Sequence, residues 1–258
     1  MKLLAFDTST DALSMAVSRL VDGEVRVWHS SGPGGAQASG SLIGGLMDLL
    51  RQADVRLAEL DAICFGSGPG SFTGLRTACS VAQGMACGAD VPVLPVPSLL
   101  ALAQAARAEA APQATQGQVT ALLDARMEEI YAATYAFAGD QWTALQAPCL
   151  VAPPDLAPWA LPAPGDGGWH AWAGNALGVY ADRLALPPSV PGVAALPTAQ
   201  AMLQLAPALL AAGHAVPASQ ALPLYVRDKV AKTTAERAVE KADKESRQAA
   251  QPGPGAHA

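Results

Sequence analysis

The 258-residue sequence has few cysteines, few aromatic residues and no long uninterrupted apolar run. Its four cysteines, Cys64, Cys79, Cys87 and Cys149, form no CxxC pair, which argues against a zinc site or a disulfide framework and favours reduced thiols in a cytosolic protein. Asp7 interrupts the first apolar residues before a signal-peptide core can form. No apolar segment reaches membrane-spanning length. We therefore expect a cytoplasmic protein that does not enter a membrane.

Histidine and positive charge are also scarce. The four histidines, His29, His170, His214 and His257, are isolated, and no two of them have the spacing of metal ligands. We therefore predict no metal site and no zinc hydrolysis. The net charge is −6 and the pI is about 5.1. Affinity for nucleic acid depends on clustered Lys and Arg, so we expect any work on RNA to require a more basic partner.

A hydrophobic fraction of 51% is ample for a packed core. Apolar and polar alternation predicts strands at 3–6, 12–18 and 25–28, and helical spacing predicts a helix at 41–51. The stretch 30–40, rich in Gly and Ser, is predicted to be a loop. The first two strands are joined by a polar turn that begins at Asp7.

A second strand–helix unit surrounds a glycine-rich turn. Residues 61–65, which are apolar after Asp61, predict a buried strand that enters the turn 66–74, and a helix is expected at 73–87, closed by Gly88. Residues 91–96 predict a strand, placed near a sheet edge because prolines interrupt it. Ser98 is predicted to cap the following helix, which should end near Ala111.

The pattern restarts after a Pro- and Gln-containing boundary at 112–118. A strand at 119–123, a turn at Asp124 and a returning strand at 130–135 repeat the opening strand–Asp–turn–strand unit. We therefore predict an α/β fold whose two halves are duplicates. The remaining predictions are an irregular surface connection at 138–172, a helix at 198–212, an extended piece at 222–227 and a charged, disordered tail from 229.

The glycine-rich turn has two interpretations. It could present backbone N–H groups and a helix N-terminus to an anion, or it could be a tight turn in which Ser71 or Thr73 caps the helix. It is not a P-loop, a GxGxxG dinucleotide motif or a GxSxG nucleophile elbow. We favour the structural turn. The residues in question are Gly66, Gly68, Gly70, Ser71, Thr73 and Gly74.

Two acidic turns are further candidates. Asp7, Thr8 and Ser9 could hold Mg²⁺–phosphate, but the turn lacks the glycine that would admit a phosphate, so a local hydrogen-bonded turn is favoured. Asp124 and Arg126, with two glutamates behind them, could be a catalytic set. A surface or inter-lobe salt-bridge turn is the favoured interpretation.

Several of these segments together resemble the TsaB (YeaZ) family. They are Leu3–Thr10, Gly68–Arg76 with Ala82–Gly84, Asp124–Met127 with Tyr131, and Leu224–Arg227. The resemblance covers residues 1 to about 135 well and returns at about 196–230. It implies two actin-like (ASKHA) lobes, each a mixed sheet with helices from a duplicated β-β-β-α-β-α unit. We expect lobes at 1–111 and 112–228, followed by the tail 229–258.

The resemblance also implies a function in tRNA modification. TsaB proteins pair with TsaD, which transfers threonylcarbamoyl to N6 of adenosine 37 in ANN-decoding tRNAs; TsaE joins the complex, and TsaC makes the adenylate intermediate. TsaD carries a His-x-x-x-His metal motif, whereas the corresponding segment 37–41 here has no histidine. The chain is thus expected to be a non-catalytic scaffold with no intrinsic cofactor, a homodimer when alone, and in contact with tRNA only through the complex. Whether ATP or ADP binds at the TsaD junction is left open.

In the family, the helices at 41–51 and 73–87 form the surface that pairs with TsaD or a second TsaB. The resemblance thus assigns partner contacts to Leu42, Leu46, Met47, Leu50, Arg76, Ala78, Val81, Ala82 and Met85. Replacement of Ala78 by Arg is expected to abolish TsaD binding and leave the fold intact. The alternatives are an active ASKHA-type phosphotransferase or ATPase and, less favoured, a peptidase.

Overall fold

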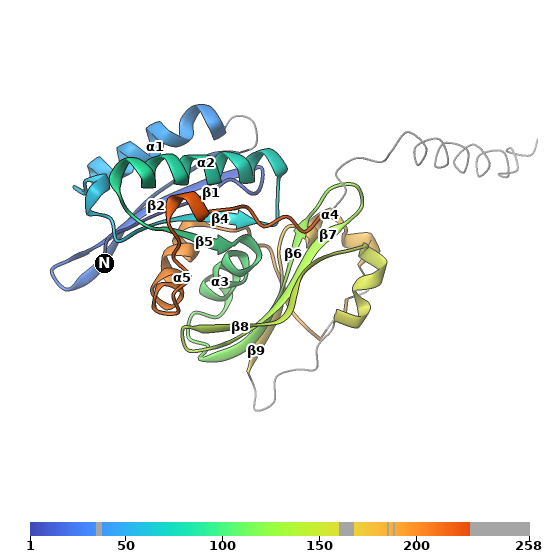
Figure 1. Ribbon diagram of the computed structural model, residues 1–258. Helices are drawn as coiled ribbons and strands as arrows, with labels where there is room; N and C mark the ends of the chain where they lie inside the picture. Colours follow the sequence, from blue (N-terminus) through green and yellow to red (C-terminus); the bar gives the residue numbers. More distant parts are fainter. Residues whose placement is uncertain (35–37, 160–167, 185, 188, 228–258) are drawn as a thin grey trace, which may run out of the picture. The chain divides into compact units, whose positions relative to one another are not determined.

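The computed structural model describes residues 1–34, 38–159, 168–184, 186–187 and 189–227 (Figure 1). Residues Met1–Val226 form one compact unit. The tail predicted from 229 lies outside the described residues, and the lobe boundary expected at 111/112 stays a prediction. No helix in the described part of the chain is both long and apolar enough to cross a membrane.

The first half of the unit forms a mixed sheet with three helices. Within the described residues the strand order is β3-β2-β1-β4-β5. β2 is antiparallel to β1 and β3, and β4 is parallel to β1 and β5. The elements are β1 (Leu3–Asp7), β2 (Ala12–Val21), β3 (Glu24–Pro33), α1 (Ala38–Gln52), the 3₁₀-helix η2 (Leu57–Glu59), β4 (Ala62–Gly68), α2 (Phe72–Ala89), β5 (Val93–Pro97) and α3 (Ser98–Ala110).

The second half repeats this topology. Its strand order β8-β7-β6-β9-β10 has the same antiparallel and parallel pairings as β3-β2-β1-β4-β5. The predicted α/β fold with duplicated halves is therefore confirmed. The elements are β6 (Gln116–Asp124), β7 (Ile130–Ala138), β8 (Gln141–Val151), η3 (Pro153–Trp159), β9 (Trp169–Ala173), α4 (Ala176–Val179), η5 (Ala181–Arg183), β10 (Gly192–Val193), α5 (Ala199–Ala211) and η6 (Ala218–Gln220).

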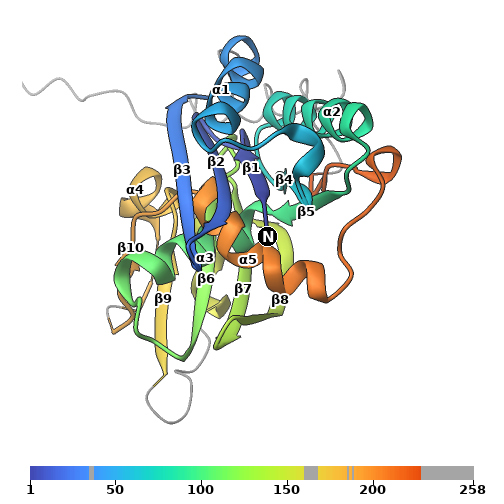
Figure 2. The same ribbon diagram turned by 90° about the vertical axis from the view of Figure 1, so that its left-hand side faces the viewer.

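Helices separate and cover the two sheets. α1 and α2 lie side by side on one face of the first sheet, and α3 and α5 lie between the sheets (Figures 1 and 2). α5 packs against β1 and β2, although it follows the second sheet in the chain, and α3 packs against β6. Leu102 of α3 and Met202 of α5 thereby share one buried core with residues of both sheets. Burial of this shared core joins the two halves into one unit.

Several predicted boundaries are wrong. β3 continues to Pro33 and α1 begins at Ala38, so the loop expected at 30–40 is much shorter. α2 ends at Ala89, not before Gly88, because Asp90 adopts the left-handed conformation (φ 55°) that ends helices. Ser98 is the first residue of α3 and makes no capping bond. The expected irregular connection at 138–172 contains β8 and β9, which complete the second sheet.

The strands predicted at 119–123 and 130–135 lie within β6 and β7, and the helix predicted at 198–212 corresponds to α5, but β6 already begins at Gln116, inside the boundary expected at 112–118. Thr198 caps α5 by accepting a hydrogen bond from Ala201 N, and the helix continues through Pro207. The extended piece near 222–226 joins no sheet, but Leu224 N donates to Ser67 O at 2.7 Å, which ties it to the end of β4.

Candidate functional site

Asp7 ends β1, and its carboxylate is fully buried. Oδ1 accepts hydrogen bonds from Ser9 N (2.8 Å) and Ser9 Oγ (2.7 Å), and Oδ2 accepts one from Ser98 Oγ (3.3 Å). Gly68 N donates to the same Ser98 hydroxyl at 3.2 Å. Ser98 therefore links the Asp7 turn to the end of β4, a role that its predicted position as a helix cap did not indicate.

Burial raises the pKa of the Asp7 carboxyl above its ordinary value of 3.8, although the hydrogen bonds from Ser9 and Ser98 oppose the rise. Gly66 of β4 packs directly against this group, since a Cβ at that position would lie 1.8 Å from Asp7 Oδ2. A larger residue at 66 would collide with the carboxylate. Gly66 is thus required by close packing.

The turn between β4 and α2 lies directly on the turn after Asp7. Thr8 Oγ1 donates to Gly74 O at 2.7 Å, and Ser71 N donates to Ser9 O at 2.7 Å. A Cβ at Gly74 would lie 1.9 Å from Thr8 O, and one at Gly70 would lie 2.5 Å from Ser9 O. These glycines therefore permit two backbone segments to touch.

The contacts bear on the two interpretations of the glycine-rich turn. The N–H groups of Gly68, Ser71 and Gly74 all have acceptors inside the chain: Ser98 Oγ, Ser9 O and Ser71 Oγ. Donors already used in this way are not available to an anion. Ser71 is the helix cap, with Gly74 N at 3.4 Å from its hydroxyl, whereas Thr73 lies exposed inside the helix. The geometry supports a structural turn.

Asp124 occupies the corresponding position at the end of β6, and its side chain is 5% exposed. It accepts hydrogen bonds from Arg126 N (2.8 Å) and Tyr180 OH (2.7 Å), and forms an ion pair with the Arg126 guanidinium at 3.2 Å. Arg126 also forms an ion pair with Asp11, in the turn that follows Asp7. The two duplicated turns are thus bridged, as the inter-lobe salt-bridge interpretation expected.

The Asp124 turn has an uncommon backbone. Arg126, Met127 and Glu128 all have positive φ values, 59°, 54° and 63°, a region that non-glycine residues seldom adopt and that active sites and tight turns use. Tyr180 OH also lies 3.2 Å from Glu129 O, which it reaches across the turn. Burial, and secondarily the Asp124 carboxylate, raises the pKa of Tyr180 to about 12. Tyr180 lies in a region where the sequence predicted no role.

Five of the predicted partner contacts lie inside the chain. The helices α1 and α2 press them against the first sheet, where each is at most 2% exposed, so they belong to this chain's own core. The correction has a simple cause: apolar residues at helical spacing mark the face that packs on the sheet. The residues are Leu42, Leu46, Leu50, Ala78 and Ala82.

The other four predicted contacts reach the surface. Met47 is 46% exposed, Arg76 is exposed, and Val81 and Met85 are half-buried. The structure adds two exposed apolar residues that the sequence did not single out, Ile43 and Phe72.

Arg76 anchors a small cluster at the start of α2. Its guanidinium lies 3.7 Å from the centre of the Phe72 ring, and its Nε donates to Tyr225 OH at 3.1 Å. The rings of Phe72 and Tyr225 are 5.8 Å apart. The cluster brings together two sequence motifs that are about 150 residues apart. Elsewhere in the described residues, no group of three or more His, Cys, Asp or Glu side chains is arranged to hold a metal ion.

Comparison with known proteins gives consistent matches. The family model described as TsaD, tRNA N6-adenosine threonylcarbamoyltransferase, matches residues 39–254. The chain is 32% identical over 243 residues to the tRNA threonylcarbamoyladenosine biosynthesis protein TsaB of Escherichia coli K12, covering 90% of this chain and 96% of that protein. It is 41% identical over 133 residues to TsaB of Haemophilus influenzae, covering 50% of this chain and 51% of that protein.

Solved structures agree in fold. A Pseudomonas aeruginosa protein described as similar to peptidase YeaZ superimposes with a TM-score of 0.75 at 36% identity, covering 88% of this chain and 99% of the other. A second structure, YeaZ from the same species, gives a TM-score of 0.72 at 36% identity, covering 87% and 99%. With its two duplicated sheets and with relatives and solved structures that match most of its length, the chain belongs to the TsaB (YeaZ) family.

Proposed function

We propose that this chain acts in tRNA threonylcarbamoyladenosine biosynthesis as a non-catalytic partner subunit that binds TsaD through the outer face of α1 and α2. In this proposal TsaD performs the transfer to adenosine 37, TsaE joins the complex, and any ATP or ADP binds at the junction. The acidic chain reaches tRNA only as part of the complex, in the cytoplasm.

The observation that carries the proposal is a set of glycines on that outer face. Gly40 and Gly44 of α1, and Gly84 and Gly88 of α2, have no neighbour within 4 Å of an added Cβ. A glycine inside a helix costs ~0.5–1 kcal/mol relative to alanine. The chain's own packing gives no reason for these glycines, but close approach of a partner's helices would.

Exposed apolar side chains accompany the glycines. Ile43 and Met47 follow one another at helical spacing on α1 and are 54% and 46% exposed. Met85 extends the apolar surface on α2, where it is half-buried. Methionine adapts its shape to a partner surface, and apolar side chains grouped on an exposed helix face are a common feature of protein interfaces.

The hydrogen-bonded turn after Asp7 supports a subunit without catalytic activity of its own. In an ASKHA phosphotransferase the turns after the first strand of each lobe would hold nucleotide phosphates. Here Ser9 donates both its N–H and its hydroxyl to Asp7 Oδ1, and the Asp7 carboxylate is also in contact with Gly66 and Ser98. These donors are not free for a phosphate, and the carboxylate is enclosed and not open to a phosphate-bound Mg²⁺, which favours the scaffold over the nucleotide-handling alternative.

Reconstitution tests the function directly. The purified chain is combined with TsaC, TsaD and TsaE from the same organism, tRNA, threonine, bicarbonate and ATP, and modified adenosine is measured by mass spectrometry. We expect product only when TsaD and this chain are both present. Product formed without TsaD would contradict the non-catalytic assignment.

The interface is tested by Gly84→Arg, which replaces the Ala78→Arg test because Ala78 is buried and its replacement would disrupt the fold. The new side chain at position 84 projects from the outer face into open space, so we expect an unchanged melting temperature and loss of TsaD co-purification. Ala211→Arg adds the same charge at an exposed position of α5 and serves as the control. TsaD binding that survives Gly84→Arg would place the interface elsewhere.

A further inference from the structure

β3 is an edge strand whose outer side is open. Within the described residues it pairs only with β2, along all ten of its residues from Glu24 to Pro33, and most of these residues are exposed. Proteins commonly protect such an edge with lysine, proline, a bulge or a covering loop. Between Glu24 and Gly32 the strand contains neither lysine nor proline, and its pairing with β2 advances without a register shift. The strand is therefore a template for a further strand.

Alternate residues of β3 direct their backbone N–H and C=O groups away from β2. The hairpin turn pairs Glu24 with Val21, so by the alternation of an antiparallel ladder the even-numbered residues bond to β2 and the odd-numbered residues point outward. In the described part of the chain, the N–H groups of Val25, Val27 and His29 have no acceptor. An added strand satisfies such a row of alternating donors and acceptors.

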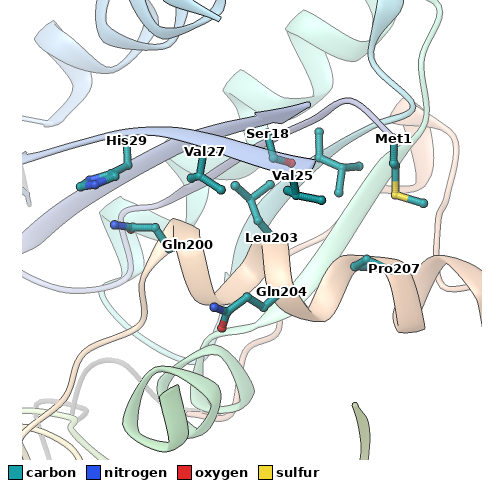
Figure 3. A pocket seen from close by; sticks show the side chains of 10 residues that line it. Met1, Ser18, Val25, Val27, His29, Gln200, Leu203, Gln204 and Pro207 are labelled. Atoms are coloured by element: carbon teal, nitrogen blue, oxygen red, sulfur yellow. The ribbon is translucent and has the colours of Figure 1, made fainter. Parts of the chain in front are cut away.

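The side chains of the same residues border an apolar groove. Val25, Val27 and His29 face Leu203 and Gln200 of α5 across this groove, which has a volume of about 610 Å³ (Figure 3). Val25 and Val27 are 69% and 43% exposed. Among the described residues, no Asp, Glu, Lys or Arg side chain lines the groove. A strand added beside β3 would place every second side chain on this face of the sheet, where apolar side chains fit best.

The opposite face of β3 carries a positive charge without a counter-charge. Arg26 is exposed and lies opposite Arg19 of β2. Arg19 forms an ion pair with Asp54, whereas Arg26 has no ion-pair partner within the described residues. Like charges in a cross-strand pair are destabilising. An acidic residue of an added strand, placed opposite Arg26 on its open side, would offset this repulsion.

We propose that the β3 edge binds an extended segment of a partner protein as an added antiparallel strand. The segment carries apolar side chains opposite Val25 and Val27, on the groove side, and an acidic side chain opposite Arg26, between them. An extended segment is the occupant because it satisfies the open backbone groups and fills the groove beside them, whereas a small molecule would do only the second. The groove lies on the α5 face of the first sheet, and α1 and α2 cover the opposite face, so this site adds to the proposed TsaD contact and does not rest on it.

A short segment is enough to occupy the site. A strand opposite residues 25–31 lies entirely along β3 and ends before the hairpin turn. Val25, Val27 and His29 can each exchange two hydrogen bonds with the residue opposite them, about six in all. In strand addition these main-chain bonds provide affinity, and the alternate side chains provide specificity.

A designed peptide tests the site with the intact chain. The probe is fluorescein-labelled Ser-Thr-Val-Thr-Val-Glu-Val-Lys, whose last two valines lie opposite Val27 and Val25 and whose glutamate lies opposite Arg26. Fluorescence anisotropy should show saturable binding to the wild type and at least about tenfold weaker binding to Val27→Lys, because lysine removes an apolar contact and protects strand edges. Val179→Lys, at a 55% exposed position of α4, is the matched control and should bind like the wild type. Thermal melting confirms that both variants are folded.

Two further measurements distinguish strand addition from binding in the groove alone. The same peptide N-methylated at its three valines cannot donate to β3 and should not bind. Hydrogen exchange measured by NMR should slow for the amides of Val25, Val27 and His29 when the unmodified peptide is added. Exchange of the Arg26 and Trp28 amides, which already bond to β2, should not change.

A charge exchange tests the register. A peptide with lysine in place of glutamate should bind the wild type at least about threefold more weakly than the probe, and should bind Arg26→Glu more tightly than the wild type. Gly84→Arg should bind the probe normally whether or not it binds TsaD, so the two proposals can fail separately. The proposal is overturned if the wild type does not bind the probe or if Val27→Lys binds it equally well. Equal binding of the N-methylated peptide would assign the groove to small apolar molecules, and binding only after a dimer dissociates would assign the edge to a second copy; either result also overturns the proposal.

Discussion

Gly66 and Asp7 lie so close that a single added carbon at Gly66 would fall 1.8 Å from the Asp7 Oδ2 atom. This contact joins β4 to β1 at the point where both strands end, and it leaves no room for another group beside the carboxylate. The neighbouring contacts of Gly70 with Ser9 and of Gly74 with Thr8 extend it along the turn. The glycine-rich sequence is therefore explained by packing between two backbone segments.

We predict that Gly66→Ala destabilises the protein by about 2 kcal/mol or more, because the methyl group must displace a buried, hydrogen-bonded carboxylate. Gly84→Ala is the matched control: its added methyl meets nothing and improves helix propensity, so stability should rise by ~0.5–1 kcal/mol. Urea unfolding at pH 7 measures both changes. If Gly66→Ala and Gly84→Ala changed the unfolding free energy equally, the close packing assigned to Gly66 would be contradicted.

The pH dependence of stability should report the burial of Asp7. Because burial raises the pKa of this carboxyl above 3.8 in the folded state, the folded chain binds more protons than the unfolded chain between 3.8 and the raised value. The contribution of Asp7 to the unfolding free energy must then fall as the pH rises through that window. Asp7→Asn keeps the acceptor for Ser9 and can donate to Ser98, but it does not titrate.

We therefore predict that the stability of Asp7→Asn relative to the wild type increases as the pH rises from about 3.8 through the raised pKa and is constant above it. Urea unfolding at a series of pH values measures the difference. A difference that is independent of pH, or that shrinks as the pH rises, would show that Asp7 titrates normally or with a lowered pKa.

Local sequence patterns predicted most strands and helices of this fold. The two strand–Asp–turn–strand units at Asp7 and Asp124 indicated the duplication, and the structure confirms it through identical strand orders. Of the two residues predicted to cap α2, Ser71 is the cap in the structure. These features depend on neighbours in the chain, so the sequence displays them directly.

Long-range contacts were not predictable in this way. Ser98 looked like a helix cap, yet its hydroxyl bonds Asp7, 91 residues earlier. The helical spacing of Leu46 and Ala78 was assigned to a partner, although these residues face the chain's own sheet. Periodicity identifies an apolar face, but it does not say what covers that face.

The missed strand β8 had a usable signal. Gly139, with φ 58°, and Asp140 form a two-residue turn between Ala138 and Gln141, which β7 and β8 pair across. Such Gly-containing dipeptides between strand-like segments indicate hairpins. Pro148 and the lack of a fully buried residue in β8 obscured this signal, because an edge strand buries little surface.

Tyr180 should contribute more to stability than Asp11, whose ion pair with Arg126 bridges the two turns. Arg126 and Asp11 are largely exposed, at 69% and 82% of their side-chain surface, and exposed ion pairs contribute ~0–1 kcal/mol. Tyr180 OH instead donates to the nearly buried Asp124. We predict a loss of about 1–3 kcal/mol for Tyr180→Phe and less than about 1 kcal/mol for Asp11→Asn. Thermal and urea unfolding of both variants measures the two losses of stability. A larger loss for Asp11→Asn than for Tyr180→Phe would contradict the prediction.

The segment after η6 should stabilise α2. Ala221 O accepts a hydrogen bond from Gln83 Nε2 at 2.9 Å, and Leu224 N donates to Ser67 O at 2.7 Å. We therefore predict that a chain ending at Gln220 is less stable than one ending at Val226, by about 1–3 kcal/mol of unfolding free energy in urea, because it loses these hydrogen bonds and the cover over Cys79.

Both truncated chains lack the same residues after 226, so the comparison isolates the effect of 221–226. Gln83→Ala in the longer chain should reproduce part of the loss, because it leaves Ala221 O without its donor from α2 while the Leu224 bond remains. Hydrogen exchange of the first turns of α2 gives an independent measure, and faster exchange in the shorter chain is expected. Equal stability and equal exchange in the two chains would show that the segment rests on α2 without supporting it.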